Sequence, residues 1–374
     1  MRTHLNTAGA GLMSRRTVET MIEVLEAEQR DGAYETEQRY DDELNVALYK
    51  ELGRLVNADP QDVAIFDSAT RAWSATFGRL ALRSGQRVII TPYEYAGNLM
   101  SLTTLQKRYG FRIEVMPLDG AGDLDLDWLR RSVDDDVALV SVPHVPSGCG
   151  IVNPVEEIGR ILDGGDALYV VDGCQSVGQL PVDVGRIGCD LFTGAGRKFL
   201  CGPRGTGFAV ASRRLRERLT PDLLDLHVAD IDQHLDVAEH VSGARGLELA
   251  ERSTAVFMGL LASLAEAPDP AGLDNGHLST ALAAELRTVD GVQVFDPGRR
   301  QSGITAFRHD RVPAARIAEE LRAAGVNVWK IAGSHTPLYL LERDVTTAVR
   351  VSVHWYTTEA DLTRFMNELR RILA

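Results

Sequence analysis

The stretch from residue 167 to residue 207 limits the possible fold of this chain most, because it combines two short apolar segments with a glycine-rich turn. Residues 167–171 read Ala-Leu-Tyr-Val-Val, a run typical of a strand that is buried on both faces. Asp172 follows at the carboxyl end, the edge at which open α/β sheets hold ligands. A second expected strand, residues 189–193, leads through the glycine-rich turn to Lys198. The stretch therefore predicts an α/β sheet that presents a carboxylate and a lysine near one edge.

Three side chains of this stretch suit chemistry with pyridoxal phosphate (PLP). A lysine amine forms a Schiff base with the cofactor's aldehyde, and a carboxylate keeps its pyridine nitrogen protonated, so that the ring can accept electrons. Lys198 and Asp172 fit these two roles, and Gln175 stands between them in the chain. We therefore predict PLP as the cofactor, Lys198 as the catalytic lysine, and Asp172 and Gln175 as cofactor-binding residues.

Residues 172–207 resemble the cofactor segment of class V aminotransferases; they read DGCQSVGQLPVDVGRIGCDLFTGAGRKFLCGPRGTG. That family is the branch of fold-type I PLP enzymes with cysteine desulfurases, selenocysteine lyases, isopenicillin N epimerase-like enzymes and cysteine-conjugate C–S lyases. Weaker matches, in order, cover most of the chain. The resemblance implies an α/β fold in which a large domain holds a mostly parallel seven-stranded sheet and a smaller α/β domain follows.

The resemblance also implies how the chain is divided. Residues 1–20 are expected as an N-terminal segment that contributes to the small domain and the active site. Residues 21–242 are expected as the large PLP-binding domain and residues 243–374 as the small C-terminal domain. The family further implies a homodimer with the cofactor near the subunit interface.

Composition limits the possible partners. The formal net charge of −13 argues against nucleic acid, since phosphate contacts need basic stripes. No stretch nears transmembrane length and the start lacks a signal-peptide core, so we expect no membrane partner and a cytoplasmic protein. The cysteines show no metal-ligand spacing and are expected as free thiols in a reducing compartment, so no metal is predicted; they are Cys149, Cys174, Cys189 and Cys201.

An anion site is expected where a third apolar run, residues 63–66, is followed by Asp-Ser-Ala-Thr and a helix from about residue 71 to residue 83. A helix start has free N–H groups and the positive end of the helix dipole. In the resembled family this position holds the cofactor phosphate, which implies Ala69 and Thr70 as phosphate contacts. Arg197 stands where the family usually has a histidine before the lysine, and is expected to bind the same phosphate.

Two positions depart from the family's usual residues. The family often reads Glu-His-His-Ala-Asn where this chain reads Glu-Tyr-Ala-Gly-Asn, so Tyr95 stands at the histidine that stacks on the cofactor ring. An aromatic ring can still stack there, but tyrosine lacks the acid–base range of histidine. Ser147, after an expected strand at residues 137–142, stands near the asparagine of desulfurases and can donate one hydrogen bond to the cofactor.

Four residues are implied at the substrate. Arg350 matches the arginine of the family's "R-x-S-x-x-x-Y-N-T-x-E" strand, whose guanidinium fork suits a carboxylate. Asn6 lies in the N-terminal segment that crosses back to the active site. Tyr34 belongs to residues 32–36, which are expected to form a non-helical, substrate-contacting loop. Ser334 falls where desulfurases have the cysteine that forms a persulfide.

Three classes of function are open to such a chain. A nucleotide-dependent oxidoreductase is disfavoured because no G-x-G-x-x-G joins a first strand to its helix. A binding protein without chemistry is disfavoured by the retained lysine, aspartate and arginine. Among PLP enzymes we favour β-elimination from an S-substituted cysteine, a C–S lyase activity, because a serine at position 334 cannot form a persulfide. A decarboxylating oxidative deaminase, an aminotransferase and an epimerase stay open.

Overall fold

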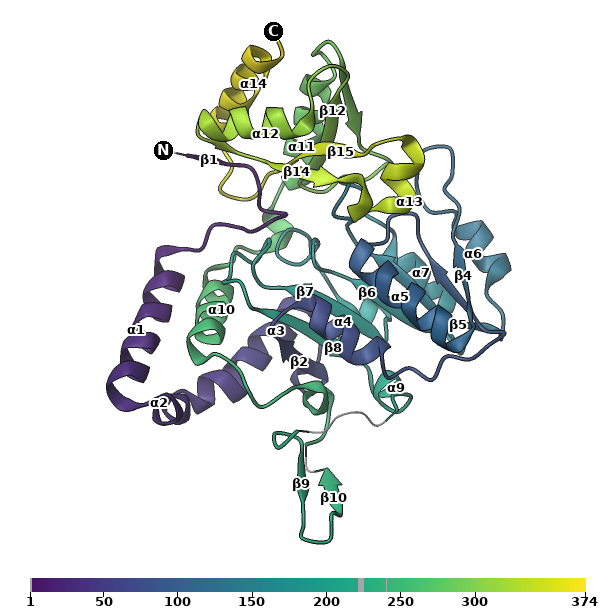
Figure 1. Cartoon of the computed structure of the whole chain (residues 1–374), viewed down its shortest axis with the longest axis vertical. Coiled ribbons are helices and arrows are strands. Elements are labelled where there is room, and N and C mark those ends of the chain that lie inside the picture. Colours follow the sequence, from purple (N-terminus) through teal and green to yellow (C-terminus); the bar gives the residue numbers. More distant parts are fainter. Residues whose placement is uncertain (1, 221–224, 240) are drawn as a thin grey trace.

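The computed structural model describes residues 2–220, 225–239 and 241–374. The chain builds two sheet-containing bodies that stand one above the other along the long axis of the molecule (Figure 1). The larger body contains the predicted cofactor segment, and the smaller body contains the C-terminus and the strand nearest the N-terminus (Figure 1).

In the described part of the chain, the larger sheet has seven strands in the order β2-β8-β7-β6-β5-β3-β4. β8 runs antiparallel to both of its neighbours, and the other pairings are parallel. The α/β fold with a mostly parallel seven-stranded sheet is thus confirmed. Its strands are β2 (Val63–Phe66), β3 (Arg87–Ile90), β4 (Arg112–Val115), β5 (Val137–Pro143), β6 (Leu168–Asp172), β7 (Leu191–Ala195) and β8 (Gly207–Ala211).

Both faces of this sheet are buried except along the edge strand β4. Val63 and Ile65 of β2 enter one hydrophobic core, while Ala64 and Phe66 enter the other, because side chains alternate along a strand. Burial on both faces explains why the inner strands are short apolar runs, whereas the exposed edge strand β4 alternates polar and apolar residues. The covering helices include α4 (Ala69–Phe77), α5 (Ala96–Tyr109), α6 (Leu126–Ser132), α7 (Val155–Leu162), α8 (Val184–Ile187) and α9 (Arg213–Arg216).

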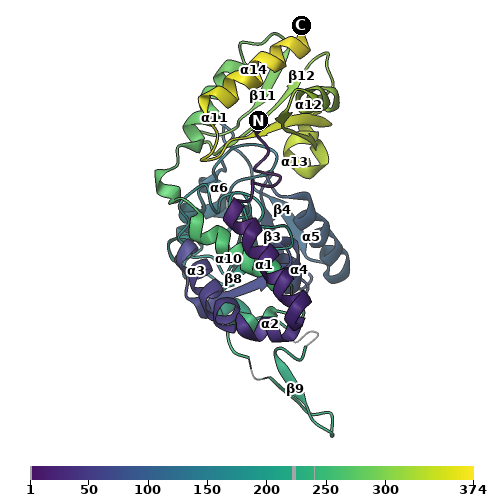
Figure 2. The ribbon, with the colours of Figure 1, turned by 90° about the vertical axis from the view of Figure 1, so that its left-hand side faces the viewer.

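Helices from the first and the last part of the larger body's sequence lie side by side. α10 (Thr254–Glu266) packs against α1 (Arg15–Asp31) and α3 (Leu48–Val56), as Figure 2 shows for α1 and α10. Apolar side chains of α10 belong to the same core as β2. The chain therefore leaves the larger core after α10, because this apolar helix finds its buried contacts there, and the division of domains at residue 243 stays a prediction.

Residues 32–36 are not the expected loop. They lie mostly in helix α2 (Ala33–Arg39), which precedes a π-helical turn, η1 (Glu43–Ala47). Gly32 adopts a φ of 101°, which lets the chain turn sharply after α1. The hydroxyl of the buried Thr36 then donates to the Gly32 carbonyl at 2.8 Å and steadies the first turn. The prediction of a non-helical segment was wrong because tertiary packing overrode weak local propensity.

The smaller sheet is antiparallel, in the order β11-β12-β15-β14. The N-terminal strand β1 (Thr3–His4) pairs in parallel with β13 (Val326–Asn327) beside it, so the two ends of the chain meet in this body. Its elements are α11 (Asn275–Leu286), β11 (Val292–Phe295), β12 (Ile304–His309), α12 (Ala314–Ala323), β14 (Trp329–Ala332), η5 (Gly333–His335), α13 (Pro337–Leu340), β15 (Thr347–Ser352) and α14 (Glu359–Leu373).

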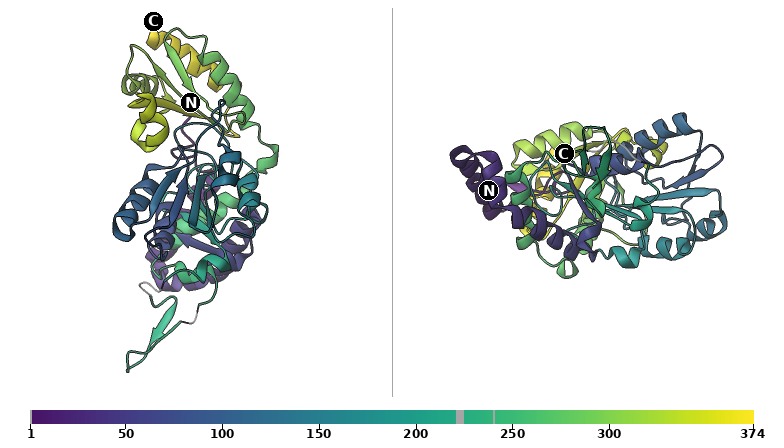
Figure 3. Two further views of the ribbon diagram at one scale, coloured as in Figure 1. Left: turned by 90° about the vertical axis from the view of Figure 1, so that its right-hand side faces the viewer. Right: turned by 90° about the horizontal axis from the view of Figure 1, so that it is seen from below.

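A hairpin of β9 (Ala229–Ile231) and β10 (Val237–Glu239) projects from the far end of the larger body (left view of Figure 3). Among the residues that the structure describes, no helix combines the length and apolar character that a bilayer crossing requires. The sheet edge that faces the smaller body is where the predicted site lies.

Candidate active site

A cavity of about 280 Å³ lies at the carboxyl ends of β5, β6 and β7. Cavities at this edge of an open α/β sheet are where such folds bind ligands. The structure brings eight predicted residues together on its lining: Ala69, Thr70, Tyr95, Ser147, Asp172, Gln175, Arg197 and Lys198.

Lys198 reaches this cavity from the glycine-rich turn after β7. At Gly196 a Cβ would collide with the side chain of Thr206, so the turn needs glycine for its close approach to the following segment. The half-buried Lys198 has its pKa lowered by burial, which Cys174 and Asp172 partly offset. A lowered pKa increases the share of neutral amine, the form that bonds to an aldehyde or accepts a proton.

Asp172 is held in place at the end of β6. Its Oδ1 accepts from the Cys174 amide at 2.9 Å, and its Oδ2 accepts from Nδ2 of Asn98 at 3.3 Å. Asn98 also lines the cavity, although no role was predicted for it. The available signal was its position four residues after Glu94 at the start of a helix, a spacing that places two side chains on one face.

Helix α4 forms the expected anion site. Its N-cap is Ser68, whose side chain accepts from the Arg71 amide at 3.2 Å. Ala69 and Thr70 therefore occupy the first helical turn, where amides lack partners within the helix. The helix begins two residues earlier than predicted and ends at Phe77, ahead of residue 83, with Gly78 as its C-cap.

Arg197 lines the cavity, and its guanidinium also donates to the carbonyl of Gly9. Burial lowers the pKa of Arg197, and nearby Cys174 partly offsets this. The contact with Gly9 shows that the guanidinium links the cavity to the N-terminal segment. Its role at a phosphate stays a prediction.

Residues 5–11, which we call the N-terminal strap, run between the two bodies. Nε2 of Gln175 donates to the Ala8 carbonyl at 3.2 Å, and the Ala8 amide donates to Oγ of Ser352 at 2.9 Å. The strap thus ties the cavity wall to β15. Asn6 forms a backbone bridge to Ser352 and its side chain lies under the strap, outside the cavity lining. The structure therefore does not place Asn6 at the cavity.

Arg350 on β15 is a buried cation without a carboxylate partner in the described part of the chain. It is 5% exposed, and its Nη1 donates to the carbonyl and the hydroxyl of Ser147 at 3.1 and 3.3 Å. Its Nε has no partner among the described residues. Burial, followed by nearby Arg197, lowers its pKa to about 10. A buried guanidinium with a free face next to Ser147 fits an anionic group of a ligand.

Two predicted substrate residues lie away from the cavity lining. Tyr34 projects from α2 and is 78% exposed. Ser334 is exposed on η5, the turn after β14. Its neighbour His335 has its pKa lowered by burial and then by Arg350, and neither Ser334 nor His335 lines the cavity.

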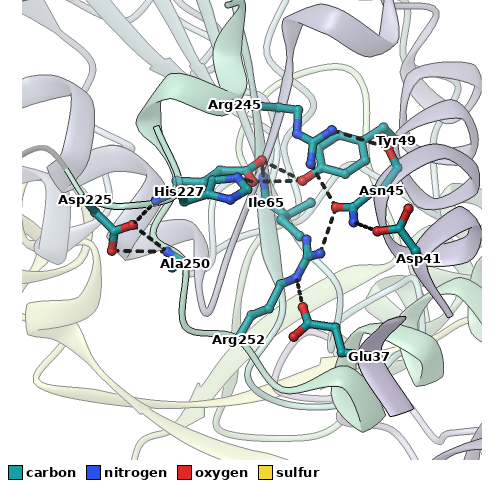
Figure 4. Close-up of polar contacts among 11 residues, drawn as sticks. Glu37, Asp41, Asn45, Tyr49, Ile65, Asp225, His227, Arg245, Ala250 and Arg252 are labelled. Atoms are coloured by element: carbon teal, nitrogen blue, oxygen red, sulfur yellow. Dashed lines mark hydrogen bonds and ion pairs between the residues drawn. The ribbon is translucent and has the colours of Figure 1, made fainter. Parts of the chain in front are cut away.

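A second polar cluster lies beside β2, and none of its described residues lines the cavity (Figure 4). The buried carboxylate of Glu248 accepts from the Tyr49 hydroxyl at 2.8 and 2.9 Å and from the Ile65 amide at 2.8 Å. The guanidinium of Arg245 lies over the Tyr49 ring at 4.4 Å. These contacts fix the edge strand of the sheet, and they provide a buried carboxylate remote from the site.

The family model described as aminotransferase class V matches residues 5–365. The chain belongs to the class V aminotransferase family. A curated relative, a probable cysteine desulfurase of Methanothermobacter thermautotrophicus, is 29% identical over 342 residues, with 88% of this chain and 84% of that protein covered. Another of the same name, from Halalkalibacterium halodurans, is 27% identical, with 84% and 78% covered.

Solved structures share the fold of this class V enzyme. A cysteine desulfurase of Escherichia coli has a TM-score of 0.87 at 21% identity, with 100% of this chain and 94% of that chain covered. The cystine C–S lyase C-DES, in complex with its product cysteine persulfide, has a TM-score of 0.86 at 21% identity, with 99% and 97% covered.

The class V enzyme is PLP-dependent, as predicted. The residues that line its cavity fit that cofactor. The α4 start suits the phosphate, Asp172 suits a protonated ring nitrogen, and Lys198 suits the aldehyde. Oε1 of Gln175 and Nε of Arg350 are buried without partners in the described residues, as expected where a polar ligand completes the hydrogen bonding.

Proposed function

We propose that this class V enzyme eliminates the β-substituent of an S-substituted cysteine, as a C–S lyase. The observation that carries the proposal is the thiol content of the site. Among the described residues, Cys174 is the only cysteine that lines the cavity, and Ser334 stands where desulfurases have their persulfide-forming cysteine.

Cys174 is poorly suited to accept sulfur. A thiolate is the nucleophile in persulfide formation. Burial raises the pKa of the Cys174 thiol well above its usual range, and the neighbouring Asp172 adds to the increase. Its amide is also fixed on Asp172, which leaves the side chain on a short rigid turn. A serine hydroxyl at position 334 cannot form a persulfide, so sulfur is expected to leave with its substituent.

The substrate's carboxylate is assigned to Arg350. The guanidinium is buried, has a free Nε and lies against Ser147 of the cavity lining. A bidentate pair would there replace the missing carboxylate partner. This contact would orient the substrate so that its Cα–H bond faces the Lys198 amine.

The other residues of the cavity are expected to bind the cofactor and to transfer the proton. The bound cofactor supplies an electron sink that makes the Cα proton acidic. Ala69, Thr70 and Arg197 are expected to hold its phosphate, with Asp172 at its ring nitrogen. Lys198 takes the Cα proton, the Cβ–S bond breaks with its electron pair on sulfur, and the thiolate leaves. The aminoacrylate that is released hydrolyses to pyruvate and ammonia.

Cysteine desulfuration is the second candidate. The curated relatives at 29% and 27% identity carry that name, and one thiol does line the cavity. The fold itself accommodates either reaction, since a desulfurase and a cystine C–S lyase both share it. Transamination, epimerisation and decarboxylating deamination use the same residues around Lys198 and are distinguished by their products.

Product analysis tests the proposal. The PLP-loaded enzyme is incubated separately with S-substituted cysteines and with free cysteine, and products and intact protein are analysed by mass spectrometry. We expect pyruvate, ammonia and the intact thiol, with no mass added to the protein. Cys174→Ala should give the same products at a similar rate. Alanine as the main product from cysteine, or a persulfide on Cys174, would establish the desulfurase alternative.

A further inference from the structure

Glu94 is a fully buried carboxylate that the proposed reaction does not use. It lies between β3 and α5 with no exposed surface. Its Oε1 accepts from Nδ2 of Asn98 at 2.9 Å and from the Tyr95 amide at 3.1 Å. Its Oε2 accepts from Oγ of Ser141, on β5, at 2.9 Å. Three donors, two from α5 and its N-cap and one from β5, therefore converge on one buried group.

This carboxylate is connected to the cavity through Asn98. The same amide nitrogen that donates to Glu94 also donates to Oδ2 of Asp172, at 3.3 Å. Because ionised carboxylates only accept, the NH₂ group of Asn98 faces both of them when Glu94 is charged. Glu94 and Asp172 are thus separated by two hydrogen bonds across one side-chain nitrogen. Through its own backbone amide, Tyr95 on the cavity lining is joined to the same group.

Packing alone does not require a charge at this position. A glutamine could accept from Asn98 and the Tyr95 amide through its oxygen, and could donate to Ser141 through its nitrogen. Burial of a carboxylate is costly unless something compensates it. In the described residues no lysine, arginine or histidine pairs with Glu94, so its charge is not cancelled locally.

Glu94 is partly charged near neutral pH. Burial raises its pKa to about 7, and Asp172 adds to the increase, while the donors Asn98, Ser141 and the Tyr95 amide oppose it. These are the charged and polar groups that face it from α5, β5 and β6. The group therefore changes charge within the pH range in which such an enzyme is assayed.

We propose that Glu94 is a positioning residue that places a second negative charge behind Asp172 and so strengthens the hold on the proton of the cofactor's ring nitrogen. The proposal rests on PLP in this cavity and on Asp172 at its ring. It does not depend on which bond the enzyme breaks. An S-substituted cysteine, free cysteine or another amino acid would meet the same charge pattern.

Protonation of the ring nitrogen, followed by the ¹⁵N resonance of ¹⁵N-labelled cofactor in the substrate-free enzyme and titrated with pH, tests the proposal, because the visible absorbance of a PLP Schiff base mainly reports its imine nitrogen. A ring nitrogen paired with Asp172 would lie one hydrogen bond beyond that carboxylate, about 9 Å from Glu94. Two unit charges at that separation interact by roughly 1.8 kcal/mol at an effective dielectric constant of about 20, or about 1.4 pKa units. Because Glu94 is only partly ionised near pH 7, we expect Glu94→Gln to move the midpoint of the titration about one unit lower. Removing a negative charge weakens proton binding, which fixes the direction.

Two further variants separate charge from structure. Glu248→Gln removes a buried carboxylate that does not line the cavity and should leave the midpoint unmoved (Figure 4). Ser141→Ala removes one donor from the charged form of Glu94 and should give a smaller shift in the same direction. If Glu94→Gln does not fold, the shift in Ser141→Ala decides the question.

A midpoint within 0.2 units of wild type in both Glu94→Gln and Ser141→Ala, on the scale of the expected roughly one-unit change, would overturn the proposal. An equal shift in Glu248→Gln would overturn it as well, because the effect would then follow any lost buried charge. If the enzyme does not convert S-substituted cysteines, the titration can still be measured. Failure of the proposed reaction can therefore be distinguished from failure of the proposal for Glu94. A wild-type protein without cofactor absorbance would instead contradict the PLP assignment on which both proposals rest.

Discussion

Replacement of Arg350 by methionine is predicted to stabilise the fold and to impair substrate binding. At 5% exposure the guanidinium has lost most of its hydration, and in the described part of the chain no carboxylate compensates it. Burial and nearby Arg197 lower its pKa from the ordinary value of an arginine to about 10. At about 1.4 kcal/mol for each pKa unit, the charged form costs the folded state about 3 kcal/mol.

The net stabilisation of the fold by Arg350→Met is smaller than this cost. Arg350→Met also removes the donation to the Ser147 carbonyl and hydroxyl, which together contribute about 1 kcal/mol. We therefore expect a gain of about 2 kcal/mol in the free energy of unfolding at neutral pH. The folded-state pKa lies below the unfolded one, so the cost is present below pH 10 and declines above it. The stability difference between variant and wild type should shrink in the same range.

Thermal unfolding of the PLP-loaded protein, with and without an amino-acid ligand, measures this prediction. The variant should melt a few degrees higher without ligand, and the ligand should raise the melting temperature of wild type only. Its kcat/KM should fall about 100-fold, as expected for the loss of a charged hydrogen-bonded pair. Arg87→Met is the matched control: this strand arginine is paired with Glu114 and Asp134, so its loss should destabilise the fold. A less stable Arg350→Met protein would show that the guanidinium is structural.

Four further predictions concern the cofactor and the assembly. Lys198→Ala should abolish turnover and should lose the borohydride-reducible bond to the cofactor, seen as the mass of the intact protein; full activity would disprove its role. Asp172→Asn should keep the shape of the site but slow turnover at least tenfold, or about 1.4 kcal/mol, and a change within twofold would contradict the assignment. Arg197→Ala should release the cofactor faster on dialysis, and unchanged retention would place its guanidinium on the N-terminal strap alone. The active enzyme is expected to be a homodimer by light scattering, and a fully active monomer at assay concentration would argue against it.

The elements of the larger sheet could be predicted from the sequence. The apolar run at residues 63–66 forms strand β2 residue for residue, because a strand buried on both faces must be a short apolar run. The roles of Asp172 and Lys198 could also be predicted from local sequence, since Asp172 ends an apolar strand and Lys198 follows a glycine-rich turn. Both residues line the cavity. The family, the α/β fold and PLP were predicted through the same segment and are confirmed.

Contacts between distant segments were decided by the tertiary structure. Arg350 meets Ser147 across 203 residues, because the smaller body packs on the larger one at this point. Asn98 meets Asp172 across 74 residues, because strand order in the larger sheet brings the start of α5 near the end of β6. The position of α10 on the larger core also depends on long-range packing. Local sequence determined which segments are strands and which side chains end them, since burial on both faces constrains each segment by itself. Which of those ends face one another, and which charges are left unpaired, depends on packing between segments that no local pattern encodes.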